Sequence, residues 1–145
     1  PTEAEWEKAA RGGCEVNPPE ACGPEDERKY PWGDAEPSCN RGRPRCCSCI
    51  GDPHAVGQRP GNDSPYGVHD MAGNAEEWVA DFWTEGYRDM PSRVVDPPGP
   101  PTGTDHVFRS GHDLPYNVRA SSRRGGTDQV AGSLHYFSFR CAYSR

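Results

Sequence analysis

Long apolar segments are missing from this sequence. Hydrophobic residues make up only 32% of its 145 residues, and the mean hydropathy is −0.96. No run approaches the roughly 20 apolar residues of a transmembrane helix, and no signal peptide is recognisable, so we expect no membrane span. The 17 glycines and 16 prolines predict one loop-rich domain that needs metal or disulfide clamps. Because the chain opens on Pro1, we expect a fragment or a processed product.

Lysine is nearly absent, with two residues in the chain, and the formal net charge is −6. This balance argues against a nucleic-acid partner, which would require a basic surface. The charge is uneven, because six arginines and only two aspartates occur from Arg109 onward. The basic segment could form an anion-binding face, but internal salt bridges to the acidic remainder are the more common arrangement.

Cysteine is absent between residues 50 and 140, whereas six of the seven cysteines lie between residues 14 and 49. No second Cys-x-x-Cys or Cys/His pair has the spacing of a zinc finger, so disulfides are favoured over zinc. We expect Cys39 to pair with Cys46 or Cys47, and Cys14 or Cys22 to pair within the same cluster. Disulfides indicate an extracellular or periplasmic location. The odd count leaves Cys141 as the orphan thiol.

Local patterns predict one helix. Thr2 and Glu5 have the spacing of a capping box, and the pair Gly12–Gly13 would end a helix over residues 3–11. Residues 30–34, Tyr-Pro-Trp-Gly-Asp, predict a tight aromatic turn. Irregular segments are expected around it, over residues 14–29, 35–63 and 86–105.

Two short strands are predicted by alternation, over residues 107–109 and 136–141. In the second, Phe137, Phe139 and Cys141 share one face. We therefore expect the Cys141 thiol to be mostly buried, near Trp6 or the first helix.

The stretch from Ser64 to Trp83 mixes carboxylates, aromatics and turn residues. Asp70 and Glu77 can supply anionic oxygens, and a turn at Gly73–Asn74 can direct carbonyls between them, which is typical of calcium ligands. The same spacing also fits a helix with Asn74 as its N-cap and Glu77 at the third helical position. Spacing alone leaves both interpretations open.

Four ordered motifs carry a resemblance: PTEAEWEKAARGG, YPWGD, YGVHDMAGNAEEWVAD and FRCAYSR. They resemble the C-terminal part of the formylglycine-generating enzyme family, also called the sulfatase-modifying factor family. The resemblance implies an α+β fold, a loop-rich variant of the C-type lectin fold that calcium stabilises. It implies a single domain over residues 1–145, truncated at its N-terminus, whose natural partner is the upstream part of the parent domain.

The resemblance also implies site residues. Calcium would be bound by the Asp70 and Glu77 side chains and the Gly73 and Ala75 carbonyls, with residues 74–83 extended rather than helical. A second calcium site would begin at Asn40, although its later ligands do not match. Cys141 would bond to a cysteine upstream of this chain.

The catalytic motif of the family departs here. The resemblance implies copper held by two cysteines after a GGS motif, but residues 109–119 contain no cysteine, and His112 replaces the serine. Glu76 also stands where active relatives have tryptophan. Because soft thiolates select Cu(I), we expect no copper.

Three functions remain open. The first, which we favour, is a binding or accessory module for an unknown protein or small molecule. The second is oxidation, by formylglycine generation or non-haem iron sulfoxide synthesis, through residues or a domain outside this chain; enzyme activity is therefore uncertain. The third is lectin-like ligand display, for which the candidate contacts are His112, Asp113, Tyr116, Arg119 and Arg123.

Overall fold

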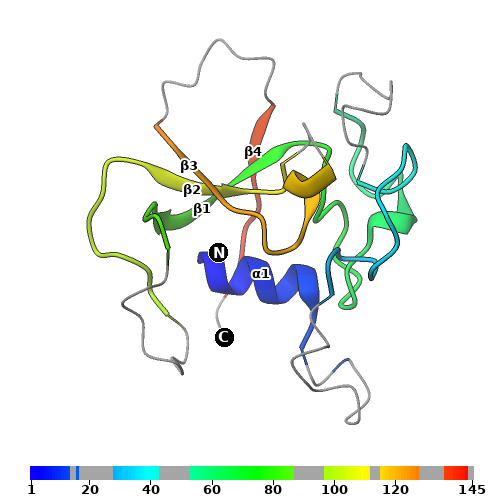
Figure 1. Cartoon of the computed structure of the whole chain (residues 1–145), viewed down its shortest axis with the longest axis horizontal. Helices are drawn as coiled ribbons and strands as arrows, with labels where there is room; N and C mark the ends of the chain where they lie inside the picture. Colours follow the sequence, from blue (N-terminus) through cyan, green and yellow to red (C-terminus); the bar gives the residue numbers. More distant parts are fainter. Residues whose placement is uncertain are drawn as a thin grey trace.

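In the residues that it describes, the structure, a computed structural model, contains one helix and four short strands (Figure 1). It describes residues 1–13, 16, 28–42, 53–86, 97–111, 115–127 and 136–143. The helix and strands are α1 (Glu3–Arg11), β1 (Glu76–Phe82), β2 (His106–Arg109), β3 (Arg124–Gly126) and β4 (Phe137–Phe139). Two 3₁₀ turns accompany them, η3 (Pro60–Asn62) and η4 (Pro115–Val118).

The capping box forms α1 as predicted. The Thr2 hydroxyl accepts from the Glu5 amide at 3.2 Å, and the Glu5 carboxylate accepts from the Thr2 amide at 2.8 Å. Both bonds satisfy amides that have no partner inside the helix. Gly12, with φ 84°, ends the helix and donates to the Lys8 carbonyl. The predicted bounds of residues 3–11 are confirmed.

The four strands form a sheet of order β3-β2-β1-β4, in which β4 runs parallel to β1 and the other pairs are antiparallel. The predicted strand at residues 107–109 is β2. The segment after Asn74 is extended, as the family resemblance implied, and the helical alternative is wrong. Side chains along β1 alternate, so Glu77, Val79 and Asp81 face α1 and its surroundings.

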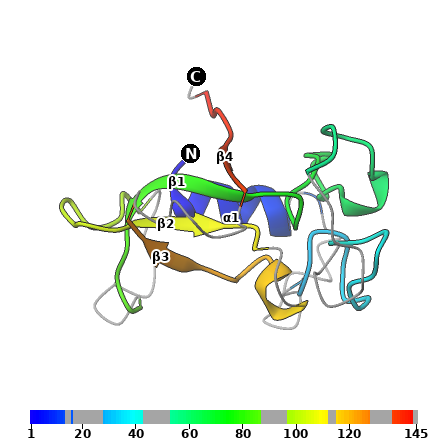
Figure 2. The same ribbon diagram turned by 90° about the horizontal axis from the view of Figure 1, so that it is seen from above.

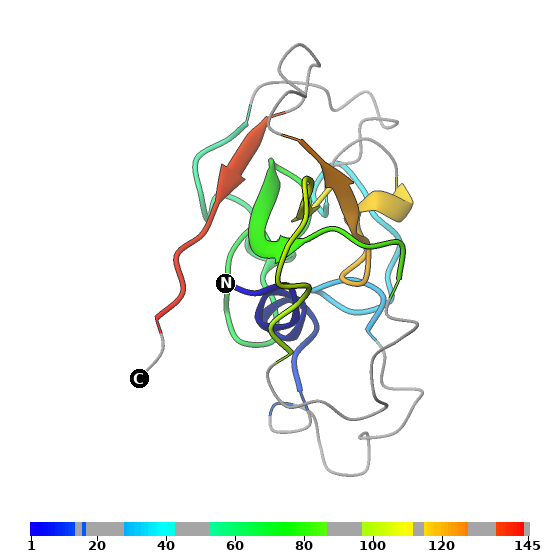
Figure 3. The same cartoon turned by 90° about the vertical axis from the view of Figure 1, so that its left-hand side faces the viewer.

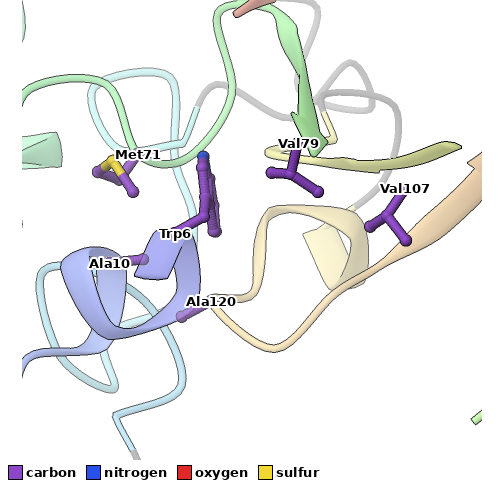
Figure 4. Packing of buried hydrophobic residues seen from close by; sticks show 6 residues of the cluster. All are labelled: Trp6, Ala10, Met71, Val79, Val107 and Ala120. Atoms are coloured by element: carbon purple, nitrogen blue, oxygen red, sulfur yellow. The ribbon is translucent and has the colours of Figure 1, made fainter. Parts of the chain in front are cut away.

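Two small clusters of buried hydrophobic residues are found in the described part of the chain. The larger joins α1, the turn before β1, and the strands through Trp6, Ala10, Met71, Val79, Val107 and Ala120 (Figure 4). The smaller contains Tyr30, Ala72 and Val118. The predicted aromatic turn belongs to it, because the Tyr30 ring stacks on Trp32 at 5.1 Å and Tyr30 and Gly33 bond to each other.

Buried charged groups also join α1 to the sheet. Arg109 of β2 is only 1% exposed, and its guanidinium donates to Glu3 at 2.7 Å and to Glu7 at 2.9 Å. It also donates to the Ala120 carbonyl and lies over the Trp6 ring. The Asp81 carboxylate of β1 accepts from the Glu3 amide at 2.6 Å. The predicted internal salt bridges therefore exist, and they fix the helix at the sheet.

The prediction of a buried Cys141 is wrong, since Cys141 is free and exposed. Strand β4 ends at Phe139, which is itself 75% exposed, so the alternation does not extend to residue 141. After Arg140, which contacts Glu77, the described part of the chain leads away from the sheet (Figures 2 and 3). Alternation in sequence identifies one side of a strand, but burial also requires a second layer packed on that side.

The cysteine cluster lies largely outside the described residues. Cys39 is described and is disulfide-bonded. Its partner and the residues Cys14, Cys22, Cys46, Cys47 and Cys49 lie outside the described part, so the predicted pairing stays a prediction. Among the described residues, α1 and the 3₁₀ turns fall short of the length and apolarity needed to cross a bilayer.

We predict that Arg109→Met lowers the free energy of unfolding by about 3 kcal/mol or more, because it leaves buried carboxylates without their cation. Urea denaturation measures the change. Lys29→Met is the matched control, because it removes the same charge from an exposed ion pair with Glu36 and should have almost no effect. Equal losses in the two variants would show that the buried network contributes no special stability.

A second prediction concerns pH. Burial raises the pKa of the Asp81 carboxyl, and this effect exceeds the opposing one of the hydrogen bond from the Glu3 amide. A carboxyl whose pKa is higher in the folded state binds more protons there, so stability falls as pH rises above about 4 through that raised value. Asp81→Asn keeps an acceptor for the Glu3 amide and removes this loss, so its stability relative to the parent should increase with pH.

The control for this experiment has the opposite sign. The hydrogen bond from Lys29 lowers the pKa of Glu36, so its contribution to stability is lost as pH falls. Glu36→Gln should therefore change stability in the reverse direction, and weakly, because both groups are exposed. Urea denaturation at several pH values measures both variants. A flat difference between Asp81→Asn and the parent would contradict the assignment.

Candidate functional site

The candidate site is the turn that precedes β1. Three residues in it adopt positive φ, namely Asp70 (54°), Gly73 (77°) and Asn74 (67°). Such a backbone turns sharply and costs non-glycine residues energy, so neighbouring contacts must hold it. At Gly73 a side chain would collide with the Gly42 carbonyl oxygen, which explains the glycine.

The loop at residues 53–57 holds the first half of the turn. The Asp70 carboxylate accepts from the Gly57 amide at 2.9 Å, and its other oxygen lies 3.3 Å from the His54 imidazole. The Asn74 side chain bonds to both the amide and the carbonyl of His54. Asp70 is only 4% exposed, so these contacts replace the water that its charge requires.

The end of β2 holds the middle of the turn. The Gly73 carbonyl accepts from the Ser110 hydroxyl at 3.0 Å and from the Ala75 amide at 2.9 Å. Ser110 is buried and adopts φ 65°. The carbonyl thus already accepts two hydrogen bonds.

Glu77 is the most heavily bonded carboxylate of the site. One oxygen accepts from the Trp6 indole at 2.7 Å and from Arg140 Nε at 2.6 Å, and the other accepts from Arg140 Nη2 at 2.5 Å. The residue is 6% exposed. The bidentate guanidinium neutralises its charge, and the indole fixes its position against α1.

The donor chemistry of the turn fits calcium. Asp70 and Glu77 are buried carboxylates seven residues apart, and Gly73 and Ala75 contribute backbone carbonyls between them. Hard oxygens of mixed charge are the ligands that calcium takes in proteins. Among the described residues, no three His, Cys, Asp or Glu side chains gather in a metal-binding group. A calcium ion here would therefore depend on the backbone as well as on the carboxylates.

The remaining predicted residues are dispersed. Asn40 is exposed. It lies in the turn between Ser38 and Arg41, and its backbone carbonyl is close to Gly61. Arg119 is exposed, whereas Arg123 forms an ion pair with Glu3 at 2.7 Å and covers the Trp83 ring. His112, Asp113 and the side chain of Tyr116 lie outside the described residues. Arg123 thus joins α1 to the sheet. A ligand that bound to Arg123 would have to disturb its ion pair with Glu3.

Sequence analysis missed three residues at this turn. Trp6, His54 and Arg140 contact its carboxylates from positions 71, 16 and 63 residues away from their partners. Trp6 and Arg140 stand in the motifs that carry the family resemblance, which was the one available signal. No local pattern indicates which carboxylate each would meet.

Comparisons with known proteins agree with this architecture. The whole chain, residues 1–145, matches the family model of the sulfatase-modifying factor enzyme 1-like domain. The formylglycine-generating enzyme of Thermomonospora curvata is 34% identical over 98% of the chain. The mouse protein named inactive C-alpha-formylglycine-generating enzyme 2 is 29% identical over 99% of the chain. The chain spans about half the length of these relatives, 48% and 42%.

A solved structure supports the fold directly. Treponema denticola variable protein 1 superposes with a TM-score of 0.63 and 26% identity, covering 88% of this chain and 41% of that one. The predicted α+β, loop-rich fold class is confirmed by this neighbour and by the four-stranded sheet with its single helix. The chain belongs to the sulfatase-modifying factor family, whose curated relatives include the formylglycine-generating enzymes.

Proposed function

We propose that this domain is a formylglycine-generating-enzyme-like module that lacks copper–thiolate catalysis and acts as a calcium-stabilised binding or accessory module. The observation that carries the proposal is the absence of cysteine between residues 50 and 140. Soft thiolates select Cu(I), and the family resemblance implies that a pair of them would lie in this segment. The one described cysteine of the C-terminal half, Cys141, follows β4 and is exposed.

The family itself includes a protein whose name records inactivity. The mouse inactive enzyme 2 matches nearly all of this chain. A relative named as inactive is thus similar to this chain over almost all of its length. In this chain the residues that support the fold are present. Trp6 of α1 donates a hydrogen bond to Glu77 of β1, and Arg109 of β2 donates to Glu3 of α1.

Oxidation by the whole protein is the alternative function. The chain spans about half of the curated relatives, so a longer protein could contribute residues from its remaining part. Ligand display is a further alternative, favoured by the likeness to the Treponema variable protein and by the exposure of Arg119. An assay of oxidation separates the first alternative from both binding functions.

We predict that the protein, supplied with copper and dioxygen, leaves a cysteine-containing peptide unoxidised. Mass spectrometry of the peptide detects the aldehyde product. The Thermomonospora curvata relative, assayed in parallel, is the positive control. Formation of aldehyde by this protein at a rate near that of the control would overturn the proposal of a non-catalytic module.

The second part of the proposal is calcium stabilisation. Asp70 and Glu77 would hold the ion with the Gly73 and Ala75 carbonyls, and the ion would supply positive charge at the buried Asp70 and share Glu77 with Arg140. The support comes from the oxygen-rich donor set, the burial of both carboxylates and the positive-φ turn that lies between them. The second site at Asn40 is left out, because Asn40 is exposed.

Chelation of calcium should lower the melting temperature, because a ligand at a hundredfold excess over its Kd stabilises the folded state by about 2.7 kcal/mol. Asp70→Ala should abolish the response to chelator. Glu36→Ala, which removes an exposed carboxylate from an ion pair with Lys29, should retain it. Scanning calorimetry with and without chelator measures all three proteins. Identical melting curves for the parent under both conditions would exclude the calcium site.

A further inference from the structure

Arg140 occupies the position of a counter-ion at Glu77. Its Nε and Nη2 atoms contact the two carboxylate oxygens at 2.6 and 2.5 Å, which is the bidentate geometry of strong charge-assisted pairs. The same Nη2 donates to the His69 carbonyl at 3.3 Å, directly before Asp70. The guanidinium therefore reaches both ends of the candidate calcium turn.

The Glu77 oxygens have limited remaining capacity. The oxygen that meets Arg140 Nε also accepts from the Trp6 indole at 2.7 Å. A calcium ion would have to share these lone pairs with the guanidinium, and two cations beside one carboxylate repel each other. Calcium and Arg140 therefore draw on the same charge.

The position of Arg140 in the chain is set by the strand that precedes it. It directly follows β4, which pairs with β1 in parallel, with Ser138 opposite Glu77. The parallel pairing of β4 with β1 thus brings residue 140 close to Glu77, and the guanidinium pairs with its carboxylate. A buried carboxylate with such a partner avoids the cost of an uncompensated charge.

We propose that Arg140 is a built-in counter-ion that competes with calcium for Glu77, so that the turn keeps its fold without metal and Arg140 sets the calcium affinity. This inference rests on the calcium site of the proposed function. On this proposal Arg140 is a positioning residue. It holds Glu77 in place and lowers the affinity of the turn for calcium.

Arg140→Gln tests the inference, with Arg124→Gln as the matched control. Arg124 forms the corresponding ion pair with Glu76, one residue earlier on β1, so the control removes the same charge without touching a predicted ligand. Isothermal titration calorimetry with Ca²⁺ as the only added ligand gives the Kd for calcium of the parent and of both variants. Melting in chelator gives the stability of the metal-free form.

We expect Arg140→Gln to bind calcium about tenfold more tightly than the parent, as loss of one charge-assisted competitor implies. Its melting temperature in chelator should fall, so its response to calcium should increase. Arg124→Gln should keep the parental Kd. Tighter binding cannot come from a general loss of structure, so a merely structural role of Arg140 would not produce it.

Each other outcome contradicts the inference in a distinguishable way. An unchanged or weaker Kd in Arg140→Gln, with binding by the parent intact, would overturn the competition and leave the calcium site in place. Absence of calcium binding in the parent and in both variants would overturn the calcium site, and with it the inference.

Discussion

The hydrogen bond between the Trp6 indole and the Glu77 carboxylate joins the N-terminal helix to the first strand of the sheet, 71 residues away in sequence. Trp6 belongs to α1, and Glu77 stands near the start of β1, directly after the candidate turn. Opposite Glu77 in the antiparallel register lies Arg109 of β2, whose guanidinium covers the Trp6 ring. The indole is thus held at its edge by an anion and at its face by a cation. Arg140 then ties the carboxylate to the segment that follows β4.

This polar junction compensates for a small hydrophobic core. The larger apolar cluster contains six buried residues, two of them alanines, and it cannot alone fix the helix on the sheet. The charged groups that supplement it, Glu3, Glu77 and Arg109, are buried and paired. Buried pairs contribute little net energy when formed, but losing one partner costs several kcal/mol. The buried ion pairs therefore hold α1 and the sheet in one fixed geometry, and removal of a single charge would disturb it. A frame of this kind can support irregular loops.

Local signals in the sequence predicted local structure. The Thr2–Glu5 capping box fixed the helix, and alternation around Val107 found β2, because both depend on neighbours within a few residues. The choice between helix and strand after Asn74 needed the family resemblance, since Glu77 fits either. The contacts of Arg140 could not be predicted, because its partner lies 63 residues away in a strand pairing that no local pattern encodes. Cys141 was misplaced because strand alternation carries no information on whether a second layer exists.

The central claim is that a buried carboxylate holds the helix to the sheet, and the exchange rate of the Trp6 indole proton tests it most directly. Trp32 is the internal reference, because its indole donates to the Ala35 carbonyl at an exposed site. Hydrogen exchange followed by NMR should show the Trp6 indole proton far better protected than that of Trp32, and Glu77→Gln should remove much of the difference. Equally fast exchange of the two indole protons in the parent protein would contradict the account.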